Sequence, residues 1–379
     1  MYGAPGHGTI GFSKGLGGVG VRVRIAVVLG LVFALAGCLS AGPKALEAAR
    51  SNYNEVLRDT ADEQLLANLV RLRYRDRPFF LEVSAVTTQF RFAPSAGVGL
   101  AAKGFRIDDD FSLSVDGGIS ETPTISYAPL QGEDFARRLL TPLSLEALVL
   151  LNHSGWSAER LFRLTVQRAN GLRNAVTASG PTPERAPDYA EFAEFARALR
   201  ALQLADGLLL GRHGTGDGAL TLAVTAQGRR SPAYETMREG LGLQGTRSAF
   251  PLRAGAQAGD GSEIVLQTRS LNGVLYFLAN AVEVPSAHLR EGRVVRTLDD
   301  AGQPFSWNRV LDGLMQVQVA DKRPKDAAVA VPYRGYWFYI DDRDGNSKAT
   351  FSLLTQLFAL QAGQRGDAAA PVLTIPAGS

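Results

Sequence analysis

Cys38 has the most distinctive chemistry in this chain, because it is the only cysteine among 379 residues. A thiolate can act as a nucleophile or a metal ligand, but a disulfide needs a second cysteine. Cys38 follows an apolar run over residues 25–36, and Arg22 and Arg24 precede that run. A charged segment, an apolar segment and small residues before a cut are typical of a signal peptide. The run is shorter than the roughly 20 apolar residues of a spanning helix; the alternative is a short buried helix in a soluble protein.

The residues around the cysteine resemble the lipobox of bacterial lipoproteins, with Leu35, Ala36 and Gly37 directly before Cys38. In that family the thiol receives diacylglycerol, and cleavage makes the cysteine the first residue of the mature protein. The resemblance implies diacylglycerol and an N-acyl chain on Cys38 and no other cofactor. No thiol would then remain for a metal site or a nucleophile.

The same resemblance predicts where the protein is located. Residues 1–37 would be the signal peptide and residues 38–43 a lipidated tether. Leu39, rather than Asp, follows the cysteine, and by resemblance to the sorting pattern of such proteins this favours the periplasmic face of the outer membrane. Outer-membrane lipid is therefore an expected partner. A single acyl chain binds a membrane reversibly, whereas several chains hold stably.

Three further stretches together resemble uncharacterised envelope lipoproteins of Gram-negative bacteria over most of the mature chain. They are residues 62–74 (DEQLLANLVRLRY), 268–277 (TRSLNGVLYF) and 338–342 (FYIDD), the last leading into 351–357 (FSLLTQL). The resemblance implies a location in the cell envelope and adds nothing about catalysis.

The charge of the mature chain gives no ground for a nucleic-acid partner. Lys14, Arg22 and Arg24 are the only charged residues of the signal peptide, and removing them leaves 37 basic and 37 acidic residues. A nucleic-acid-binding domain is typically basic. We therefore expect no nucleic-acid partner.

The pattern of apolar residues predicts an α+β fold, with a helical N-terminal part, an inserted antiparallel β-hairpin and a following mixed α/β domain. Thr60 and Glu63 match a capping box, which predicts that a helix begins near Thr60. Ser144 and Ser157 are expected to cap later helices. The predicted parts are a helical domain over 44–176 with the hairpin over 79–127, a proline-rich linker over 177–187, the mixed domain over 188–361 and a disordered tail over 362–379.

The sharpest structural signal is the alternating pattern over residues 97–120. Its arms of about ten residues, around a turn at 108–110, match the roughly 9–11 residues of a tilted membrane strand. A lone hairpin cannot enter lipid, because its edge amides and carbonyls would have no partners, so a pore would require several copies of the chain. The alternatives are an ordinary half-buried sheet with one wet face and a hairpin that packs on a partner. The apolar face would consist of Val98, Leu100, Ala102, Phe111, Leu113, Val115 and Ile119.

Two clusters could carry hydrolytic or metal chemistry. Asp341, Asp342, Asp344 and Asn346 suggest a calcium loop, but counting from Asp342 places Ser347 and Leu353 where an EF-hand needs Gly and Glu. The cluster is therefore predicted to be a polar turn, with Asn346 or Ser347 capping the next helix.

The residues 153–156 (HSGW) partly match a nucleophile elbow, but Asn152 replaces its first glycine and no strand is expected before it. A turn between two helices is the simpler prediction. His153, His213 and His288 are far apart in sequence, and neither a zinc pair nor a catalytic triad is visible among them. We predict no catalytic residue and no metal ligand.

Two further patterns have ordinary explanations. Alternating arginines at 71, 73, 75 and 77 could contact an anion such as a lipid headgroup, but cations at a helix C-terminus are also favourable. The aromatic residues Trp307, Trp337 and Tyr339 could bind a glycan or a small molecule, although such residues usually belong to a core. The preferred prediction is a non-enzymatic lipoprotein in assembly, scaffolding or homo-oligomeric export, with other envelope proteins as further candidate partners. A periplasmic hydrolase or a glycan or small-molecule binder is the alternative.

Overall fold

The computed structural model describes the chain over six ranges: 54–98, 113–212, 218–245, 247–257, 259–362 and 373–376. Within the first two of these ranges, residues 84–98 and 113–124 are described by their backbone alone. The chain divides into two compact units, Met1–Ala61 and Asp62–Ser379. Cys38 and the lipobox residues Leu35, Ala36 and Gly37 lie outside the described residues.

The first described element is one continuous helix over 54–73. Thr60 lies inside it, and its hydroxyl donates to the main-chain carbonyl of Val56 at 2.8 Å. The prediction that a helix begins at Thr60 with a capping box is therefore wrong. A hydroxyl within a helix can bond back to the carbonyl four residues earlier, and the sequence alone does not distinguish this from a cap.

A long antiparallel hairpin follows, made of β1 (Leu81–Val98) and β2 (Leu113–Pro129). The two strands pair from Leu81 opposite Pro129 to Val98 opposite Leu113, with one irregularity near Val83. The predicted insertion over 79–127 agrees with these bounds. Of the predicted apolar face, Val98, Leu113, Val115 and Ile119 lie on the paired strands, whereas Leu100, Ala102, Phe111 and the turn at 108–110 lie outside the described residues.

A short strand near the C-terminus joins this hairpin. β12 (Leu373–Pro376) pairs antiparallel with β2, from Leu373 opposite Tyr127 to Pro376 opposite Thr124. The sequence indicated a disordered tail from residue 362 and did not predict this strand. Because the four residues LTIP are a very short run in an Ala-, Gly- and Pro-rich segment, their strand signal is weak, and pairing with the edge of β2 is what defines the element.

The main sheet has six strands in the order β4-β3-β8-β7-β6-β5. Its pairs are antiparallel except for β7 and β8, which run parallel. Strands on both sides of residues 177–187 therefore belong to one sheet. The bounds are β3 Val166–Ala169, β4 Leu172–Arg173, β5 Leu208–Arg212, β6 Leu220–Val224, β7 Ala249–Ala254 and β8 Ile264–Thr268.

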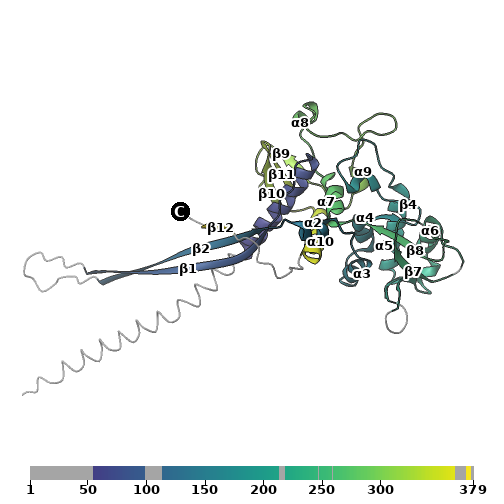
Figure 1. Cartoon of the computed structure of the whole chain (residues 1–379), viewed down its shortest axis with the longest axis horizontal. Coiled ribbons are helices and arrows are strands. Elements are labelled where there is room, and N and C mark those ends of the chain that lie inside the picture. The colour runs from purple at the N-terminus through teal and green to yellow at the C-terminus, as the bar shows by residue number, and fades with distance from the viewer. Residues whose placement is uncertain are drawn as a thin grey trace, which may run out of the picture. The chain divides into compact units, whose positions relative to one another are not determined.

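Eleven further helices, two of them short 3₁₀ turns, lie in the described part of residues 113–362, together with a second small sheet (Figure 1). Ser144 accepts from the amide of Ala147 at 3.2 Å and Ser157 from that of Arg160 at 3.4 Å, so both predicted caps are confirmed. The helices are α2 Glu133–Leu140, α3 Leu145–His153, α4 Ala158–Thr165, η1 Val176–Ser179, α5 Ala190–Leu204, η2 Gly228–Arg230, α6 Pro232–Gly240, α7 Leu271–Ala279, α8 Ser286–Arg290, α9 Asn308–Leu311 and α10 Gly345–Ala362, η1 and η2 being the 3₁₀ turns. The small sheet has the order β10-β11-β9, with β9 Gln318–Ala320, β10 Ala327–Tyr333 and β11 Tyr336–Asp341.

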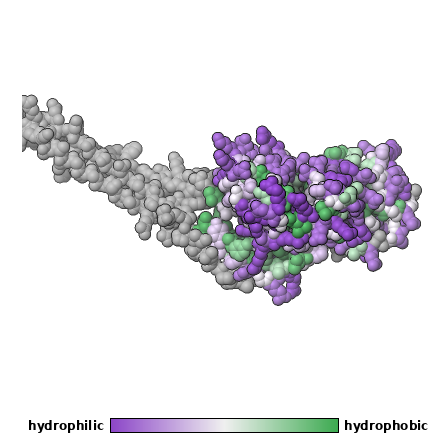
Figure 2. All heavy atoms as spheres, turned by 90° about the horizontal axis from the view of Figure 1, so that it is seen from above, coloured by the Kyte–Doolittle hydropathy of each residue, from purple (hydrophilic) through white to green (hydrophobic). Residues whose placement is uncertain are grey.

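One continuous core joins these elements within residues 62–361. Its buried apolar side chains run from Leu65 in the first helix to Leu357 in α10. On the face drawn in Figure 2, hydrophobic residues of the coloured part are scattered among hydrophilic ones. The fold is thus α+β, as predicted.

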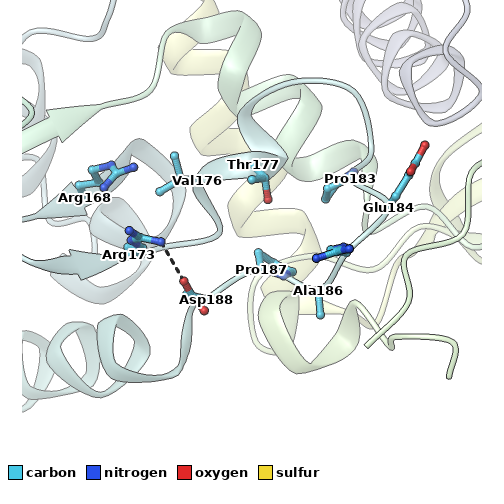
Figure 3. A pocket seen from close by; sticks show the side chains of 10 residues that line it. Arg168, Arg173, Val176, Thr177, Pro183, Glu184, Ala186, Pro187 and Asp188 are labelled. Atoms are coloured by element: carbon cyan, nitrogen blue, oxygen red, sulfur yellow. Dashed lines mark hydrogen bonds and ion pairs between the residues drawn. The ribbon is translucent and has the colours of Figure 1, made fainter. Parts of the chain in front are cut away.

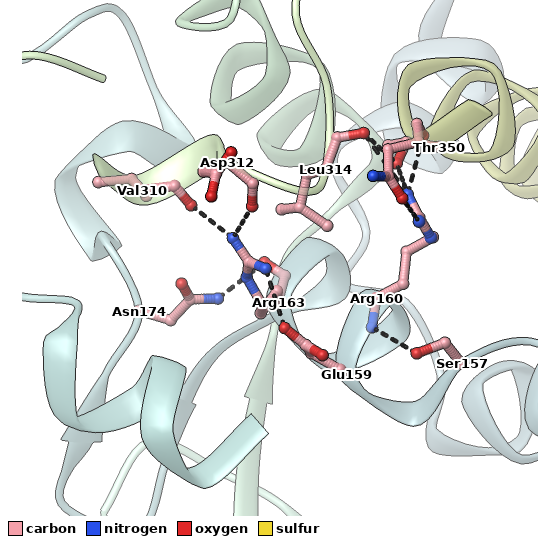
Figure 4. A network of polar contacts seen from close by, with 10 residues as sticks. Ser157, Glu159, Arg160, Arg163, Asn174, Val310, Asp312, Leu314 and Thr350 are labelled. Atoms are coloured by element: carbon pink, nitrogen blue, oxygen red, sulfur yellow. Dashed lines mark hydrogen bonds and ion pairs between the residues drawn. The ribbon is translucent and has the colours of Figure 1, made fainter. Parts of the chain in front are cut away.

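Two arginines of α4, the helix that leads into strand β3 of the main sheet, form hydrogen bonds with α9, the residue after it and the start of α10 (Figure 4). Arg163 donates to the carbonyls of Val310 and Asp312 at 3.0 and 2.8 Å. Arg160 donates to Asn346 and Thr350 at the start of α10. Because a guanidinium has five donors in a fixed fork, it can bind several carbonyls at once. These side chains hold the body together and leave α4 without free cationic groups at this contact.

Candidate functional site

The base of the hairpin is held by two side-chain amides of the first helix. Gln64 Nε2 donates to the carbonyl of Leu81 at 3.0 Å, and the amide of Leu81 donates to Gln64 Oε1 at 2.7 Å. Asn68 makes the same pair of bonds with Phe79, at 2.8 and 2.9 Å. A carboxamide offers a donor and an acceptor side by side. Each of these side chains therefore makes the pair of backbone hydrogen bonds that a neighbouring strand would otherwise make with Phe79 or Leu81.

Aromatic packing completes this attachment. The ring of Phe80 lies 5.8 Å from that of Phe135 and 5.2 Å from that of Phe358, measured between centroids. The amide of Leu130 at the end of β2 donates to the carbonyl of Phe80 at 2.9 Å. Both strands of the hairpin are therefore fixed to the helices where they leave the body. A signal for this attachment is present in the sequence, because Gln64 and Asn68 are polar residues in a helix whose neighbouring positions are apolar.

Beyond its base, the hairpin has long strand edges that pair with no other strand among the described residues. In the described residues β1 pairs only with β2, and β12 covers β2 over residues 124–127 alone. The outer edge of β1 and most of the outer edge of β2 thus carry no partner strand in the part of the chain that the structure describes. Such rows of amides and carbonyls are templates for pairing with another chain.

The arginines at the end of the first helix differ from one another in burial and in their hydrogen-bond partners, so they do not form a uniform row of surface cations. Arg75 adopts a left-handed conformation, with φ 60°, and ends the helix. Arg71 donates to Asn68, and Arg75 donates to the carbonyl of Thr182 at 3.0 Å. Arg73 is buried, with 7% of its surface exposed, and donates to Thr182 Oγ1 and to the carbonyl of Val295.

A cavity of about 310 Å³ opens beside Arg73. We call it the Arg73 cavity and define it by Arg73, Asn280, Thr297, Phe305 and Trp307, together with Glu283 and Arg296 near its edge. Trp307 Nε1 donates to Thr297 Oγ1 at 3.0 Å, and this hydroxyl donates to the carbonyl of Pro183 at 2.7 Å. The polar groups of Trp307 and Thr297 are thus engaged within the protein.

A second, more open pocket of about 500 Å³ lies between the β3–β4 hairpin and residues 183–188 (Figure 3). Arg168, Arg173 and Arg185 contribute positive charge to its lining, and Glu184 and Asp188 contribute negative charge. Arg173 already forms an ion pair with Asp188 at 3.2 Å, and both side chains are largely exposed. The lining therefore carries charges of both signs, and interactions between exposed charges are weakened by water. These two features do not indicate a strong anion-binding site.

The carboxylates at 341, 342 and 344 make ordinary structural contacts, as expected of a polar turn. Asp341 pairs with Arg343 and Asp342 with Lys348. Asp344 accepts from the amides of Asn346 and Ser347 at 3.1 and 3.0 Å. Asp344 is therefore the cap of α10, and the prediction of Asn346 or Ser347 as the cap is wrong because α10 begins at Gly345, directly after Asp344. Among the described residues, no three His, Cys, Asp or Glu side chains are grouped to hold a metal ion.

The residues 153–156 form a turn between α3 and α4, as predicted. His153 Nε2 lies 2.6 Å from the carbonyl of Leu210, and Ser154 Oγ donates to the carbonyl of Leu150 at 2.9 Å. His213 lies outside the described residues. His288 is buried, and its Nδ1 lies 2.7 Å from the hydroxyl of Tyr74. The structure therefore does not bring His153 and His288 into one hydrogen-bonded group among the described residues.

The three aromatic residues are also separated in their contacts. Trp307 is buried beside the Arg73 cavity, whereas the guanidinium of Arg323 stacks over the ring of Trp337 at 5.3 Å. The hydroxyl of Tyr339 donates to Gln318 at 2.8 Å. Trp307 lines the Arg73 cavity, whereas Trp337 and Tyr339 line neither this cavity nor the pocket beside the β3–β4 hairpin.

No protein-family model, curated protein or solved structure matches this chain. The helices of the described residues include none that is long and apolar enough to cross a membrane.

Proposed function

We propose that this protein is a lipid-anchored, non-enzymatic component of the outer membrane, and that copies of it assemble through the β1–β2 hairpin. The proposal depends on the outer parts of the two strand edges, which pair with no other strand among the described residues. The resemblance of residues 35–38 to a lipobox, and the wider resemblance to envelope lipoproteins, support the location. Diacylglycerol and an N-acyl chain on Cys38 would hold the chain at the periplasmic face.

The dimensions of the hairpin support assembly through its edges. β2 has 17 residues, and a rise of about 3.3 Å per residue makes it about 55 Å long. A tilted membrane strand needs only roughly 9–11 residues. The hairpin is therefore long enough to cross a bilayer with its outer part while its base remains attached to the body. Its strands are longer than the roughly 3–10 residues usual in globular proteins, and an isolated two-stranded hairpin is at best marginally stable in water, which favours pairing with further strands.

Pairing between copies would satisfy the free edges. The outer edge of β1 in one copy and that of β2 in the next are antiparallel partners in a repeated β1–β2 order, so each copy can add two strands to a common sheet. Among the described residues, β12 pairs with β2 only at its base, at residues 124–127. Pro94 and Pro123 each remove one backbone donor from these strands, which interrupts a ladder locally but does not prevent pairing on either side.

The fixed base supports the same conclusion. Gln64 and Asn68 hold the start of β1 through four hydrogen bonds. A hairpin that emerges from the body in a fixed direction presents its edge reproducibly, and this reduces the entropy lost on assembly.

The test is the mass of the detergent-extracted, full-length protein by native mass spectrometry. The matched variant replaces residues 88–123 by an Asn-Gly turn, which keeps the pair Thr87 opposite Thr124 and every bond at the base. The wild type is expected to be a closed oligomer and the variant a monomer with an unchanged unfolding midpoint. A monomeric wild type, or a variant with the oligomeric mass of the wild type, would contradict assembly through the hairpin.

The location has its own test. Labelled palmitate is expected on the wild type and not on the Cys38→Ser variant, which should no longer fractionate with the outer membrane. If the label is absent from the wild type, the lipoprotein part of the proposal fails, whatever the oligomeric mass is.

A further inference from the structure

The register of the β1–β2 hairpin separates its residues by polarity. Residues directly opposite each other in an antiparallel pair share one face, and successive residues of a strand alternate between the two faces. The pairing has no irregularity from Val86 opposite Ile125 to Val98 opposite Leu113. The face of every residue in this stretch is therefore defined by the register.

One face is almost wholly apolar, and we call it the apolar face. Thr88 and Glu121 are its only polar residues in this stretch, and both lie in the half nearer the base. Its charge-free part, over 92–98 and 113–119, is compatible with contact with hydrocarbon. The face consists of the pairs Val86–Ile125, Thr88–Pro123, Phe90–Glu121, Phe92–Ile119, Pro94–Gly117, Ala96–Val115 and Val98–Leu113.

The other face carries polar or small residues throughout, and we call it the polar face. Arg91 and Asp116 are the charged residues on it. Charged side chains facing lipid are destabilising, whereas they are ordinary on a surface that meets water. The face consists of the pairs Thr87–Thr124, Gln89–Thr122, Arg91–Ser120, Ala93–Gly118, Ser95–Asp116 and Gly97–Ser114.

A half-buried sheet of a globular protein also alternates in this way, but its apolar face packs on the core of the same protein. Among the described strands and the helices α2 to α10, only β12 makes extensive contact with the paired strands β1 and β2. Residues 90–98 and 113–121 give nine positions in each strand, which meets the roughly 9–11 residues of a tilted membrane strand. An apolar face toward lipid and a polar face toward water is the pattern of strands that cross a membrane around an aqueous interior.

We propose that the assembled hairpins enclose a water-filled channel for small ions, with the apolar face against lipid and the polar face lining the channel. Each copy contributes one Asp116 in the middle of the stretch and one Arg91 nearer the base. The assembly therefore places two rings of charge along the path of an ion, and such rings control which ions pass. This inference rests on the proposed assembly through the hairpin.

Single cysteines test which face meets water. The full-length protein is reconstituted in phosphatidylcholine vesicles and treated with a charged methanethiosulfonate reagent. Ser95→Cys and Ser114→Cys place a thiol on the polar face. Ala96→Cys and Val115→Cys place it on the apolar face and are expected to react at least about tenfold more slowly, because the thiolate is the reactive form and lipid disfavours it. The unsubstituted protein is the blank, since acylation of Cys38 would leave it no thiol.

Native mass spectrometry of the same samples separates this test from the test of assembly. Equal reaction at the two faces, or faster reaction at the apolar face, in samples of oligomeric mass would overturn the channel and leave assembly intact. A monomeric wild type would overturn assembly and the channel with it. Ser120→Cys and Val98→Cys are the second pair, one on each face, for any position where a substitution prevents assembly.

Conductance across a planar bilayer tests whether ions pass. The wild type is expected to conduct in potassium chloride, and the variant with residues 88–123 replaced by an Asn-Gly turn is not. In a salt gradient Asp116→Asn should move the reversal potential toward that of chloride and Arg91→Gln toward that of potassium, because each removes one ring of charge. Glu121→Gln removes a charge from the apolar face and should leave the potential unchanged. An assembled wild type that does not conduct, or a potential that Asp116→Asn and Arg91→Gln do not move, would overturn the proposal.

Discussion

Replacing Arg269 by methionine is expected to lower the free energy of unfolding by about 2–6 kcal/mol. Arg269 has 1% of its surface exposed, and its guanidinium lies 4.1 Å from the centroid of the Phe277 ring. It donates to Ser179 Oγ at 3.1 Å. It also donates to the main-chain carbonyls of Arg163, Leu164, Val166 and Asn174.

The size of the expected loss in free energy of unfolding depends on which carbonyls lose their only hydrogen-bond donor. Arg163 O and Val166 O also accept from the side chain of Asn174, so they remain satisfied. Leu164 O and Asn174 O have no other hydrogen bond in the described residues, and an orphaned buried group costs about 1–3 kcal/mol. Two such groups give the range of about 2–6 kcal/mol. Part of this loss in stability is offset, because the methionine variant no longer has to bury a charged guanidinium.

The assay is chemical denaturation followed by circular dichroism at pH 7, where Arg269 is charged, since burial lowers its pKa only to about 9. Arg269→Lys keeps a cation but not the planar fork of five donors, so it should lose at least as much stability as the methionine variant. Arg168→Met, on the neighbouring strand, is the matched control and should stay within about 0.5 kcal/mol. If Arg269→Met equals the wild type within that margin, the carbonyls do not depend on the guanidinium and the reasoning fails.

Two further predictions concern pH and close packing. Burial lowers the pKa of His288, so as the pH falls through about 6.5 the unfolded chain binds a proton that the folded chain does not, and stability falls with it. His288→Gln should make denaturation midpoints at pH 7.5 and pH 5 more nearly equal than in the wild type, and an unchanged difference would refute this role. In Gly228→Ala the added carbon would lie 2.7 Å from the carbonyl oxygen of Gly207, so a loss of roughly 1–3 kcal/mol is expected. Gly180→Ala, which meets open space, should cost much less, and equal melting temperatures of the two variants would contradict the prediction.

Local signals predicted much of the helix and strand pattern. The serines at 144 and 157 cap helices where the sequence placed them, because a cap depends only on a hydroxyl and the amides two or three residues later. The same logic failed at Thr60, since a threonine can bond forward as a cap or backward within a helix. It also failed at Asn346, because Asp344 lies nearer the first free amides of α10.

The contacts that matter most for the site join residues far apart in sequence. Arg73 reaches a hydroxyl 109 positions away, and Arg269 reaches carbonyls about 100 positions earlier. No periodicity or spacing in one sequence records such pairs, and an arginine is ordinarily read as a surface residue. The resemblance of residues 268–277 to a family motif marked Arg269 without its role. The signal that could have found Gln64 and Asn68 was present, because both interrupt an apolar stripe.

One helix positions both the base of the hairpin and Arg73. Gln64 and Asn68 hold the base of β1, and Arg73 lies one to three turns further along the same helix, at about 1.5 Å per residue. Arg75 ends the helix in a left-handed conformation, and its side chain donates to the carbonyl of Thr182. Because this helix is buried along one face and bonded at both places, the base of the hairpin and the end of the helix at Arg73 belong to one packed unit.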